Sequence, residues 1–479
     1  MRRDLDVLAA REHDLLIVGG GIYGAASAWD AAQRGLRVAL VERDDFGAGV
    51  SWNSLKTIHG GLRYLQKADL ARMRESIRER RALLRIAPAL VRPLPFLVPT
   101  FGHGLAGPEA LRIALAFNDL ISHDRNDGLP ATHHIPRGRM LSRDEVLGRL
   151  PGVAAHGLNG GGLWTDAQVA SSERLGVAFV HAAAEAGALV ANHVEALGFL
   201  KAGGRVTGIR ARDVLAGEDL PIRARLVLNA AGPGVDALLA EGGIHRAPTP
   251  LLKAWNLVFA RPPVVPFAVG ARTAGRFLFM VPWRDRSIVG TAYAPPETRS
   301  DEAVAAFRDE AVRAFPWARL DDVPLALVHE GLVPGHGGPS GLATRPRLHD
   351  HETEDGVAGL VSIQGVKYTT ARAVAEKAVD LGLRRLGRPP NPCRTAVTPL
   401  PRARPLEGTL AARTLEAVRE EMALTLSDVV LRRLDLGTAG PPSEADLETV
   451  TRTMATHLGW DSARVGAERA ALAKRFPPA

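Results

Sequence analysis

One short stretch, SWNSLKTIHGGLRYL from Ser51 to Leu65, gathers several side chains that can do chemistry. Histidine changes its protonation state near neutral pH, so His59 can accept a proton from a reacting hydroxyl. Arg63 offers a fixed guanidinium fork for a phosphate or a carboxylate, and Tyr64 offers a neutral hydrogen-bond donor. The pair Gly60-Gly61 lets the backbone pass close to a planar ring. The stretch therefore predicts an anion-binding site beside a proton acceptor.

A β-α-β pattern precedes this stretch. The apolar run DLLIV at 14–18 has the length of a buried strand, and the Ala-rich segment at 22–35 ends in a glycine, as helices commonly do. A second buried-type run, LRVALVE, follows at 36–42. By the right-handed crossover rule, such a unit of about 30 residues begins a parallel sheet covered by helices.

Three glycines with the spacing Gly19-x-Gly21-x-x-Gly24 lie between this strand and helix, and Glu42 closes the second strand. Gly19 permits a tight turn, Gly21 lets the backbone approach a pyrophosphate, and Gly24 allows the helix to pack closely on the strand. The helix N-terminus presents its N–H groups to the phosphate. Glu42 would accept ribose hydroxyls and repel a 2′-phosphate, which favours FAD or NAD over NADP. The alternative is that the glycines only shape a turn.

The order of the remaining elements favours FAD over a nicotinamide cofactor. In a plain nicotinamide dehydrogenase consecutive β-α units would complete the sheet. Here the pattern stops after the second strand and resumes at RLVLNAAGPG (225–234) and at GLVSIQGVKYTTAR (359–372). Both later segments place glycine after a strand, so we expect Gly232 and Gly365 to lie beside the cofactor.

Five segments resemble the FAD-dependent glycerol-3-phosphate dehydrogenases, within the wider amino-acid-oxidase-like flavoproteins. They are the N-terminal unit from DLLIVGGGIYG to GAGVS, then KTIHGGLRYL, LVLNAAGPGV, VPWRDRSIVGT and GVKYTTARAVAEKA. The likeness runs in order from about residue 14 to residue 390, and IHGGLRYL is a specific motif.

The resemblance implies an α/β protein with a Rossmann-like FAD-binding domain interleaved with an antiparallel-sheet substrate domain. A small C-terminal helical domain follows. The expected boundaries are 1–65, 150–240 and 340–394 for the FAD-binding domain, 66–149 and 241–339 for the substrate domain, and 395–479 for the helical domain. Short β-rich runs between 245 and 335 are typical of an antiparallel sheet, and the Pro-rich segment at 88–102 predicts extended chain or an edge strand.

In the family the C2 hydroxyl of glycerol 3-phosphate is oxidised, giving dihydroxyacetone phosphate, and the reduced flavin passes its electrons to quinone or oxygen. The resemblance implies catalytic roles for His59, Arg63 and Lys367. It also implies substrate contacts from Arg63, Tyr64, Arg345 and Lys367. For His59 a structural hydrogen bond is the alternative, for Arg63 a surface or structural ion pair, and for Lys367 a solvated side chain.

Ser51 and Ser54 are expected to contact the phosphate or ribityl part of FAD, with loop capping as an equal alternative. One departure from the family concerns the substrate. Where the family carries an arginine in a GVRPL-type segment that grips the substrate phosphate, this chain has Val333. Losing one charge-assisted partner of a phosphate costs roughly 1.5 to 3 kcal/mol. His336 is a possible replacement, although a loop histidine is more often incidental, and TDAQVASSE from Thr165 is also altered.

The departure keeps a second hypothesis open, in which a related FAD enzyme oxidises a different secondary alcohol, hydroxy acid or amine. A third hypothesis is a flavin-bound protein that binds a membrane or a partner without turnover. It rests on the net charge of +8, the arginines after Asp69 and the helical tail. Only seven of the sixty cations are lysines, so the charge also fits a solvated surface from a GC-rich genome.

Composition limits the other classes of function. A length of 479 residues predicts two to four domains, and 46% apolar with 23% charged residues is typical of a folded globular protein. The single cysteine, Cys393, excludes a disulfide framework or a cysteine-based metal cluster, and no metal is expected. No nucleic-acid motif is present. With no apolar run of membrane-spanning length and no cleavable leader, we expect a cytoplasmic protein, with a location peripheral to the inner face of the membrane as the alternative.

Overall fold

The structure is a computed structural model that describes residues 1–104, 107–336 and 341–476. The chain forms two compact units. The first joins Met1–Trp52, Ser171–Leu252 and the chain from Leu332 onward, and the second joins Asn53–Ala170 and Lys253–Gly331. Residues 53–65 and 150–170 thus cluster with the second unit, and the three-domain division expected from the sequence stays a prediction.

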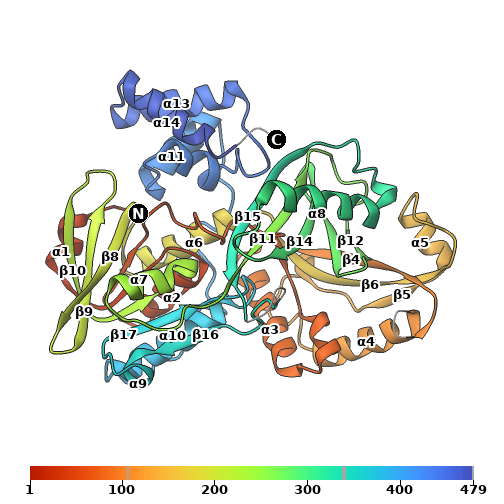
Figure 1. Ribbon diagram of the computed structural model, residues 1–479, viewed down its shortest axis with the longest axis horizontal. Coiled ribbons are helices and arrows are strands. Elements are labelled where there is room, and N and C mark those ends of the chain that lie inside the picture. Colours follow the sequence, from red (N-terminus) through yellow and green to blue (C-terminus); the bar gives the residue numbers. More distant parts are fainter. Residues whose placement is uncertain (105–106, 337–340, 477–479) are drawn as a thin grey trace. The chain divides into compact units, whose positions relative to one another are not determined.

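The first unit is built on a mostly parallel sheet, of which strands β10, β16 and β17 are labelled in Figure 1. The strand order is β16-β17-β10-β1-β2-β7. Its strands are β1 (Glu12–Val18), β2 (Val38–Val41), β7 (Leu189–Ala191), β10 (Asp219–Asn229), β16 (Arg347–Asp350) and β17 (Leu360–Gln364). β1 pairs in parallel with β2 and with β10, and β10 pairs in parallel with β17. The sheet is therefore interrupted in sequence and completed by later segments, as the glycine-containing segments predicted.

A hairpin and several helices cover this sheet. The hairpin of β8 (Val194–Ala202) and β9 (Arg205–Asp213) turns at Gly203-Gly204, and β9 joins β10. The helices are α1 (Leu5–Ala10), α2 (Ile22–Gln33), α6 (Ser172–Glu185), α7 (Val235–Glu241), the 3₁₀ turn η4 (Gly232–Gly234), α9 (His351–Glu354) and α10 (Ala371–Arg385). Small residues let α2 pack closely, and Trp29 of α2 meets Phe179 of α6 at 5.5 Å between ring centroids.

The second unit is built on a mainly antiparallel sheet with the order β15-β11-β14-β13-β12-β4-β6-β3, and β5 pairs with β6. Its strands are β3 (Thr57–Ile58), β4 (Val91–Phe101), β5 (Arg139–Leu141), β6 (Leu158–Val169), β11 (Leu251–Phe259), β12 (Ala268–Arg272), β13 (Phe277–Trp283), β14 (Arg286–Ala294) and β15 (Leu325–Pro334). The antiparallel pairs β11–β14 and β13–β14 confirm the sheet expected between 245 and 335.

The segment at 88–102 forms extended chain as expected, but it is not an edge strand. β4 lies inside the sheet, antiparallel to β6 over its whole length and parallel to β12 at Phe96 and Leu97. Pro93, Pro95 and Pro99 all occupy alternate positions, so their missing N–H groups point to one side of the strand. The other side can therefore keep the full ladder with β6, and only the short pairing with β12 faces the prolines.

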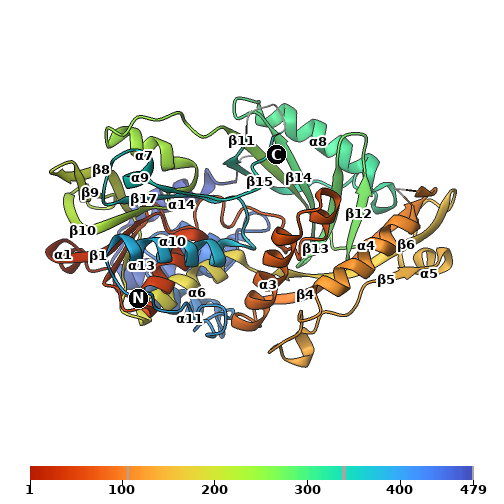
Figure 2. The same cartoon turned by 90° about the horizontal axis from the view of Figure 1, so that it is seen from below.

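Helices lie on both faces of this second sheet (Figure 2). They are the 3₁₀ helix η1 (Leu62–Lys67), α3 (Leu70–Ile86), α4 (Pro108–Ile121), the 3₁₀ turn η3 (Ala131–His133), α5 (Arg143–Arg149), α8 (Ser300–Ala314) and the 3₁₀ turn η5 (Pro316–Ala318). Phe307 of α8 packs in one core with Leu97 of β4, whereas Leu115 of α4 packs in another with the adjacent Phe96. Neighbouring residues of a strand point to opposite faces, so the two helices cover opposite sides of the sheet.

The tail contains only helices among its described residues. They are α11 (Leu410–Glu421), α12 (Leu426–Asp428), the π-helical turn η6 (Val429–Arg433), α13 (Glu444–Leu458) and α14 (Ser462–Ala473). Their apolar faces form a core of their own that includes Leu426, Val430 and Met454. Across residues 1–104, 107–336 and 341–476 there is no helix long and apolar enough to cross a lipid bilayer.

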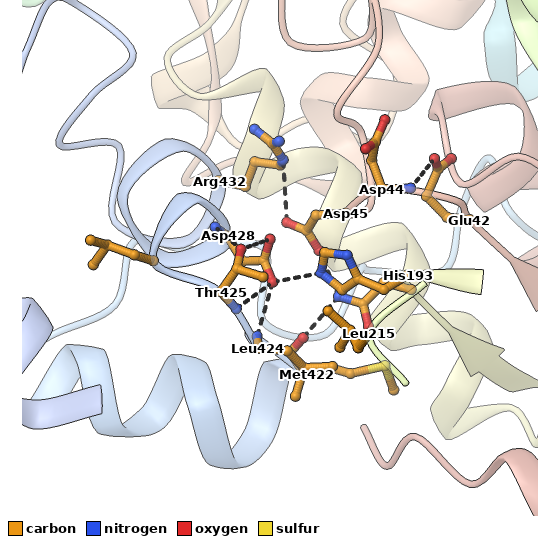
Figure 3. Close-up of polar contacts among 12 residues, drawn as sticks. Glu42, Asp44, Asp45, His193, Leu215, Met422, Leu424, Thr425, Asp428 and Arg432 are labelled. Carbon is orange, nitrogen blue, oxygen red and sulfur yellow. Dashed lines mark hydrogen bonds and ion pairs between the residues drawn. The ribbon is translucent and has the colours of Figure 1, made fainter. Parts of the chain in front are cut away.

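Buried charges join the tail to the first sheet (Figure 3). Asp45, which follows β2, accepts hydrogen bonds from Arg433 at 2.6 and 2.8 Å and lies 3.3 Å from Arg432. Nε2 of His193, which precedes β8, lies 2.9 Å from Oδ2 of Asp428. Because breaking a buried ion pair costs about 3–5 kcal/mol, these contacts hold the tail helices against the sheet.

Candidate active site

The glycine loop connects β1 to α2 in the first unit. Gly19 has a φ of +105°, and a Cβ there would lie 2.5 Å from the carbonyl oxygen of Ala230. A Cβ on Gly24 would lie 1.8 Å from the carbonyl oxygen of Gly19. Gly21 is the N-cap of α2 and, being glycine, makes no side-chain capping hydrogen bond. Only glycines therefore let α2 approach the ends of β1 and β10 this closely.

Glu42, directly after β2, faces this loop. Its Oε2 accepts the N–H of Gly20 at 2.7 Å, and its Oε1 accepts the N–H of Asp44 at 3.0 Å (Figure 3). Burial raises the pKa of Glu42, and the two backbone N–H groups partly oppose that effect. A carboxylate oxygen accepts more than one hydrogen bond, so both oxygens retain capacity for ribose hydroxyls.

The two serines hold backbone N–H groups in the structure. Oγ of Ser51 accepts the N–H of Ile22, the first residue of α2, at 2.9 Å. In the second unit, Oγ of Ser54 accepts the N–H of Lys56 at 3.2 Å. Each serine therefore shapes the chain locally, which is the capping role that the sequence left open, and their contact with FAD stays a prediction.

The loop fits a dinucleotide pyrophosphate. Its floor is glycine backbone, and a Cβ on Gly21 would already stand 3.0 Å from Oγ of Ser51. A helix of twelve residues starts there, and the positive end of its dipole points toward the loop. An acid lies at the end of the neighbouring strand. A backbone cradle of this kind, a helix N-terminus and an acid together suit the phosphates and the ribose of FAD.

Gly232 and Gly365 lie where β10 and β17 end. Gly232 has a φ of +58° with open space around its Cα, whereas a Cβ on Gly365 would lie 2.1 Å from the ring of Tyr23. Tyr23 Oη donates to the carbonyl oxygen of Lys367 at 2.7 Å and accepts the N–H groups of Val366 and Lys367, each at 3.0 Å. This network ties the start of α2 to the segment that presents the half-buried side chain of Lys367.

His59 belongs to a polar chain in the second unit. Its Nδ1 lies 3.3 Å from Oδ2 of Asp166, and its side chain is 46% exposed. Asp166 is 5% exposed at its side chain, accepts the N–H of Gly60 at 2.7 Å and forms an ion pair with Arg80. Arg80 also donates to the carbonyl oxygen of Thr165 at 3.1 Å. The imidazole is thus anchored on one nitrogen, while the exposed part of the ring faces outward.

The charge of Asp166 is stabilised from several sides. Burial by itself would raise its pKa, but the hydrogen bond with His59, the charge of Arg80 and the N–H of Gly60 lower the pKa to about 2. A permanently ionised carboxylate behind a histidine ring fixes the orientation of the ring and stabilises its protonated form. The arrangement can therefore receive a proton at the other ring nitrogen.

Sequence reasoning missed Asp166 and Arg80. The segment TDAQVASSE departs from the family pattern, but nothing near it in sequence points to His59, which is 107 residues away. The pairing of β3 with β6, with Ile58 opposite Ala167, brings the two together. Position 60 requires glycine, because a Cβ there would lie 2.2 Å from Arg80 Nη1. The glycine makes room for the ion pair beneath the backbone.

The neighbouring residues of the motif have different surroundings. Gly61 has a φ of +88° and is the N-cap of η1. Tyr64 is buried with Met73 and Ile77, so its expected contact with substrate stays a prediction. Arg63 is exposed, and its charge lowers the pKa of Tyr293 against the stronger opposite effect of burial. An exposed guanidinium is accessible to an anion.

Val333 is half-buried near the end of β15. His336 is exposed, and its N–H donates to the carbonyl oxygen of Gly341 at 2.6 Å. Arg345 is exposed on the segment that leads into β16. These positions leave the roles of His336 and Arg345 as predictions.

The interrupted parallel sheet, the glycine cradle and the acid after β2 define a flavoprotein-type dinucleotide fold. The chain belongs to the FAD dependent oxidoreductase family, whose sequence model matches residues 14–381, and its cofactor is FAD. Residues 391–465 match the C-terminal domain of alpha-glycerophosphate oxidase. The recognition made from IHGGLRYL and the other segments is thereby confirmed.

Curated relatives are named glycerol-3-phosphate dehydrogenase. The protein of Synechocystis sp. is 33% identical over 417 residues, which cover 82% of this chain and 73% of the relative. That of Mycobacterium leprae is 34% identical and covers 77% of this chain and 63% of the relative. The human mitochondrial enzyme is 31% identical, and the chain spans only 54% of its length.

Solved structures confirm the fold. The glycerol-3-phosphate dehydrogenase from Bacillus halodurans complexed with FAD matches with a TM-score of 0.75 at 23% identity, covering 98% of this chain and 95% of the other. L-alpha-glycerophosphate oxidase from Mycoplasma pneumoniae with FAD bound has a TM-score of 0.58 at 16% identity, over 82% and 99% of the two chains.

Proposed function

We propose that this chain oxidises sn-glycerol 3-phosphate to dihydroxyacetone phosphate. The names of the relatives at 33 and 34% identity support the substrate class. FAD, when bound, supplies the acceptor for a hydride from C2 at its N5 atom. The reaction also requires a group that takes the proton of the C2 hydroxyl, and His59 is the candidate for that role.

The observation that carries the proposal is the chain of contacts from His59 through Asp166 to Arg80. With Nδ1–H directed to Asp166, Nε2 keeps a lone pair and accepts the hydroxyl proton. The imidazolium that results is stabilised by the buried carboxylate, and Arg80 keeps that carboxylate ionised.

The phosphate of the substrate requires cations. We assign Arg63 and Lys367 to the substrate, with Arg345 and Tyr64 as further contacts, on the basis of the motifs shared with the family. Arg63 and Arg345 are exposed, and Lys367 is held by backbone bonds to Tyr23. An arginine fork recognises phosphate with two parallel hydrogen bonds, so Arg63 is the strongest of these candidates.

Val333 supports the second candidate function, oxidation of an unphosphorylated secondary alcohol, hydroxy acid or amine. An apolar side chain cannot contact a dianion, and its place in β15 holds it half-buried. The third hypothesis, flavin binding without turnover, is not retained, because the family to which the chain belongs consists of oxidoreductases.

Anaerobic single-turnover reduction of the bound flavin tests the proposal. We expect glycerol 3-phosphate to bleach the flavin, while glycerol, glycerate and amino acids do so far more slowly. Reduction by an unphosphorylated compound alone would establish the second candidate and refute the first. The same reduced enzyme, mixed with a soluble quinone or with oxygen, identifies the electron acceptor; we propose one of these two, with a possible peripheral contact to the membrane.

A further inference from the structure

Three ionisable side chains meet at the edge of the first sheet, where β16 leads through α9 toward β17. His349 lies on β16, and His351 is the first residue of α9. Their side chains are 4% and 0% exposed. Oδ2 of Asp355 lies 2.7 Å from Nε2 of His349 and 2.6 Å from Nδ1 of His351. The two imidazole centroids are 4.3 Å apart. One carboxylate oxygen thus faces two nearly buried ring nitrogens.

The outer nitrogen of each ring also has a polar neighbour. Nε2 of His351 lies 2.8 Å from Oγ of Ser362 on β17. Nδ1 of His349 lies 2.9 Å from Oε2 of Glu354, although without the alignment of a full hydrogen bond. Glu354 is held in turn by Arg347 at 2.8 Å. Metal-ligating histidines usually give their second ring nitrogen to a carboxylate or another acceptor in this way.

We propose that His349, His351 and Asp355 form a binding site for a divalent cation of the zinc type. All three offer a ligand atom, and these atoms lie within 4.8 Å of one another. Two imidazoles and one carboxylate are a ligand set that Zn²⁺ accepts, with water in the fourth position. Asp355 is 24% exposed at its side chain, so the fourth position is open to solvent.

Binding requires the cation to occupy the space between Asp355 and the two ring nitrogens that face it, so these nitrogens must carry no proton. Each neutral imidazole keeps its single proton and carries it on the outer nitrogen. Ser362 allows this at His351, because a hydroxyl accepts as readily as it donates. Glu354 allows it at His349, because its carboxylate oxygen lies 2.9 Å from Nδ1 and can accept Nδ1–H once the two groups align. The carboxylate oxygen then moves away from each ring nitrogen by roughly 0.6 Å, because zinc bonds of about 2.0–2.1 Å at tetrahedral angles place ligand atoms about 3.3 Å apart.

The role of such an ion is to tie three elements together. His349 lies on β16, His351 on α9, and Ser362 on β17, whose end leads to Gly365 and Lys367. A cation here fixes the edge of the sheet, and it lies outside the glycine loop and outside the His59 motif. We therefore expect it to raise thermal stability and to leave the identity of the substrate unchanged.

Calorimetric titration of the chelator-treated holoenzyme with ZnCl₂ tests the site. We expect one equivalent to bind, and we expect the melting temperature to rise with zinc and to fall again when EDTA is added. Asp355→Asn and His349→Gln remove a ligand each and should abolish that equivalent. Ser362→Ala keeps all three ligands and should weaken binding about 10- to 100-fold.

His181→Gln is the matched control. His181 is a buried histidine 3.1 Å from the carboxylate of Glu185 four residues on, in the same unit and without a second histidine beside it. Its zinc titration should equal that of the wild type. Circular dichroism and flavin content of each variant show that it is folded. The proposal is overturned if the wild type binds no stoichiometric zinc, or if folded Asp355→Asn and His349→Gln bind it as the wild type does.

Discussion

Replacing Asp166 by Asn removes one charge from the His59 chain while keeping its shape. Asp166 has a pKa of about 2 against an ordinary value of 3.8, a difference worth about 2 kcal/mol of stability. Because the pKa is lowered in the folded state, this stabilisation is present above pH 3.8 and is lost as the pH falls toward 2. At neutral pH the variant loses all of it. It also leaves Arg80 buried without its partner.

The effect on the reaction should be larger. Positioned proton acceptors contribute about 10²–10⁴-fold to rate, and an amide in place of Asp166 no longer stabilises an imidazolium at His59. We expect the anaerobic rate of flavin reduction by substrate to fall at least about 10²-fold at saturating substrate, with a smaller change in the substrate concentration needed for half-maximal rate. Stopped-flow absorbance of the flavin measures both.

Asp124→Asn provides the control. Asp124 also has a pKa of about 2, and it pairs with Arg74 and with Arg81 at 2.7 Å in the same unit, but it makes no contact with His59. Its loss of stability should have the same sign and be smaller, because Asp124 is less buried than Asp166, and its rate should be close to that of the wild type. The reasoning is refuted if folded Asp166→Asn keeps its rate within about threefold. It also fails if His59→Gln and Asp166→Asn reduce the rate additively, because two members of one proton-accepting unit cannot do so.

Three further predictions follow from other parts of the molecule. Gly24→Ala should lower the flavin content, and it should lower the free energy of unfolding by about 1–3 kcal/mol, since the new Cβ would meet the carbonyl oxygen of Gly19. Gly176→Ala is the control and should be neutral or slightly stabilising, because a Cβ there has nothing within 4 Å. Flavin absorbance and melting curves distinguish the two variants. Burial would lower the pKa of His193, but the hydrogen bond and charge of Asp428 outweigh it and raise that pKa, so the pair stabilises the fold fully below about pH 6.5 and progressively less as pH rises through the raised value. The difference in melting temperature between wild type and His193→Gln should accordingly shrink from pH 6 to pH 9, and a constant or growing difference would contradict this assignment. If glycerol 3-phosphate is the substrate, Val333→Arg should lower its KM roughly ten- to a hundredfold, while Val333→Leu should not; equal KM values for both variants would show that position 333 lies away from the phosphate.

Local sequence was sufficient for the cofactor-binding half of the protein. The loop from Gly19 to Gly24 needs glycine because of its own backbone conformation and the approach of a helix that follows immediately in the chain. The apolar runs around it have strand length, and the crossover between them has one favoured hand. Most of these requirements act between residues close in sequence; the exception is Gly19, where a Cβ would also meet the carbonyl oxygen of Ala230. They can therefore be deduced from the order of residue types, and the family resemblance was visible in the same segments.

Contacts between distant segments could not be deduced in this way. The three prolines of β4 indicated an edge, yet the strand lies inside the sheet because all three occupy one side of the ladder. The helix α8 and the buried pairs of Asp45 with Arg433 gave no local signal that was recognised. Alternation along a strand shows which face a side chain occupies. It does not show which strand will lie beside it.

The residue types of this chain by themselves determined a flavin-binding fold, its glycine cradle and a histidine motif that could accept a proton. The tertiary structure alone decided what stands behind that histidine: β6 brings Asp166 under His59, and α3 supplies Arg80 to keep the carboxylate ionised. The physical reason is that backbone conformation depends on neighbours in the chain, whereas a buried ion pair depends on which surfaces pack together. Only folding brings residues 59, 80 and 166 into contact.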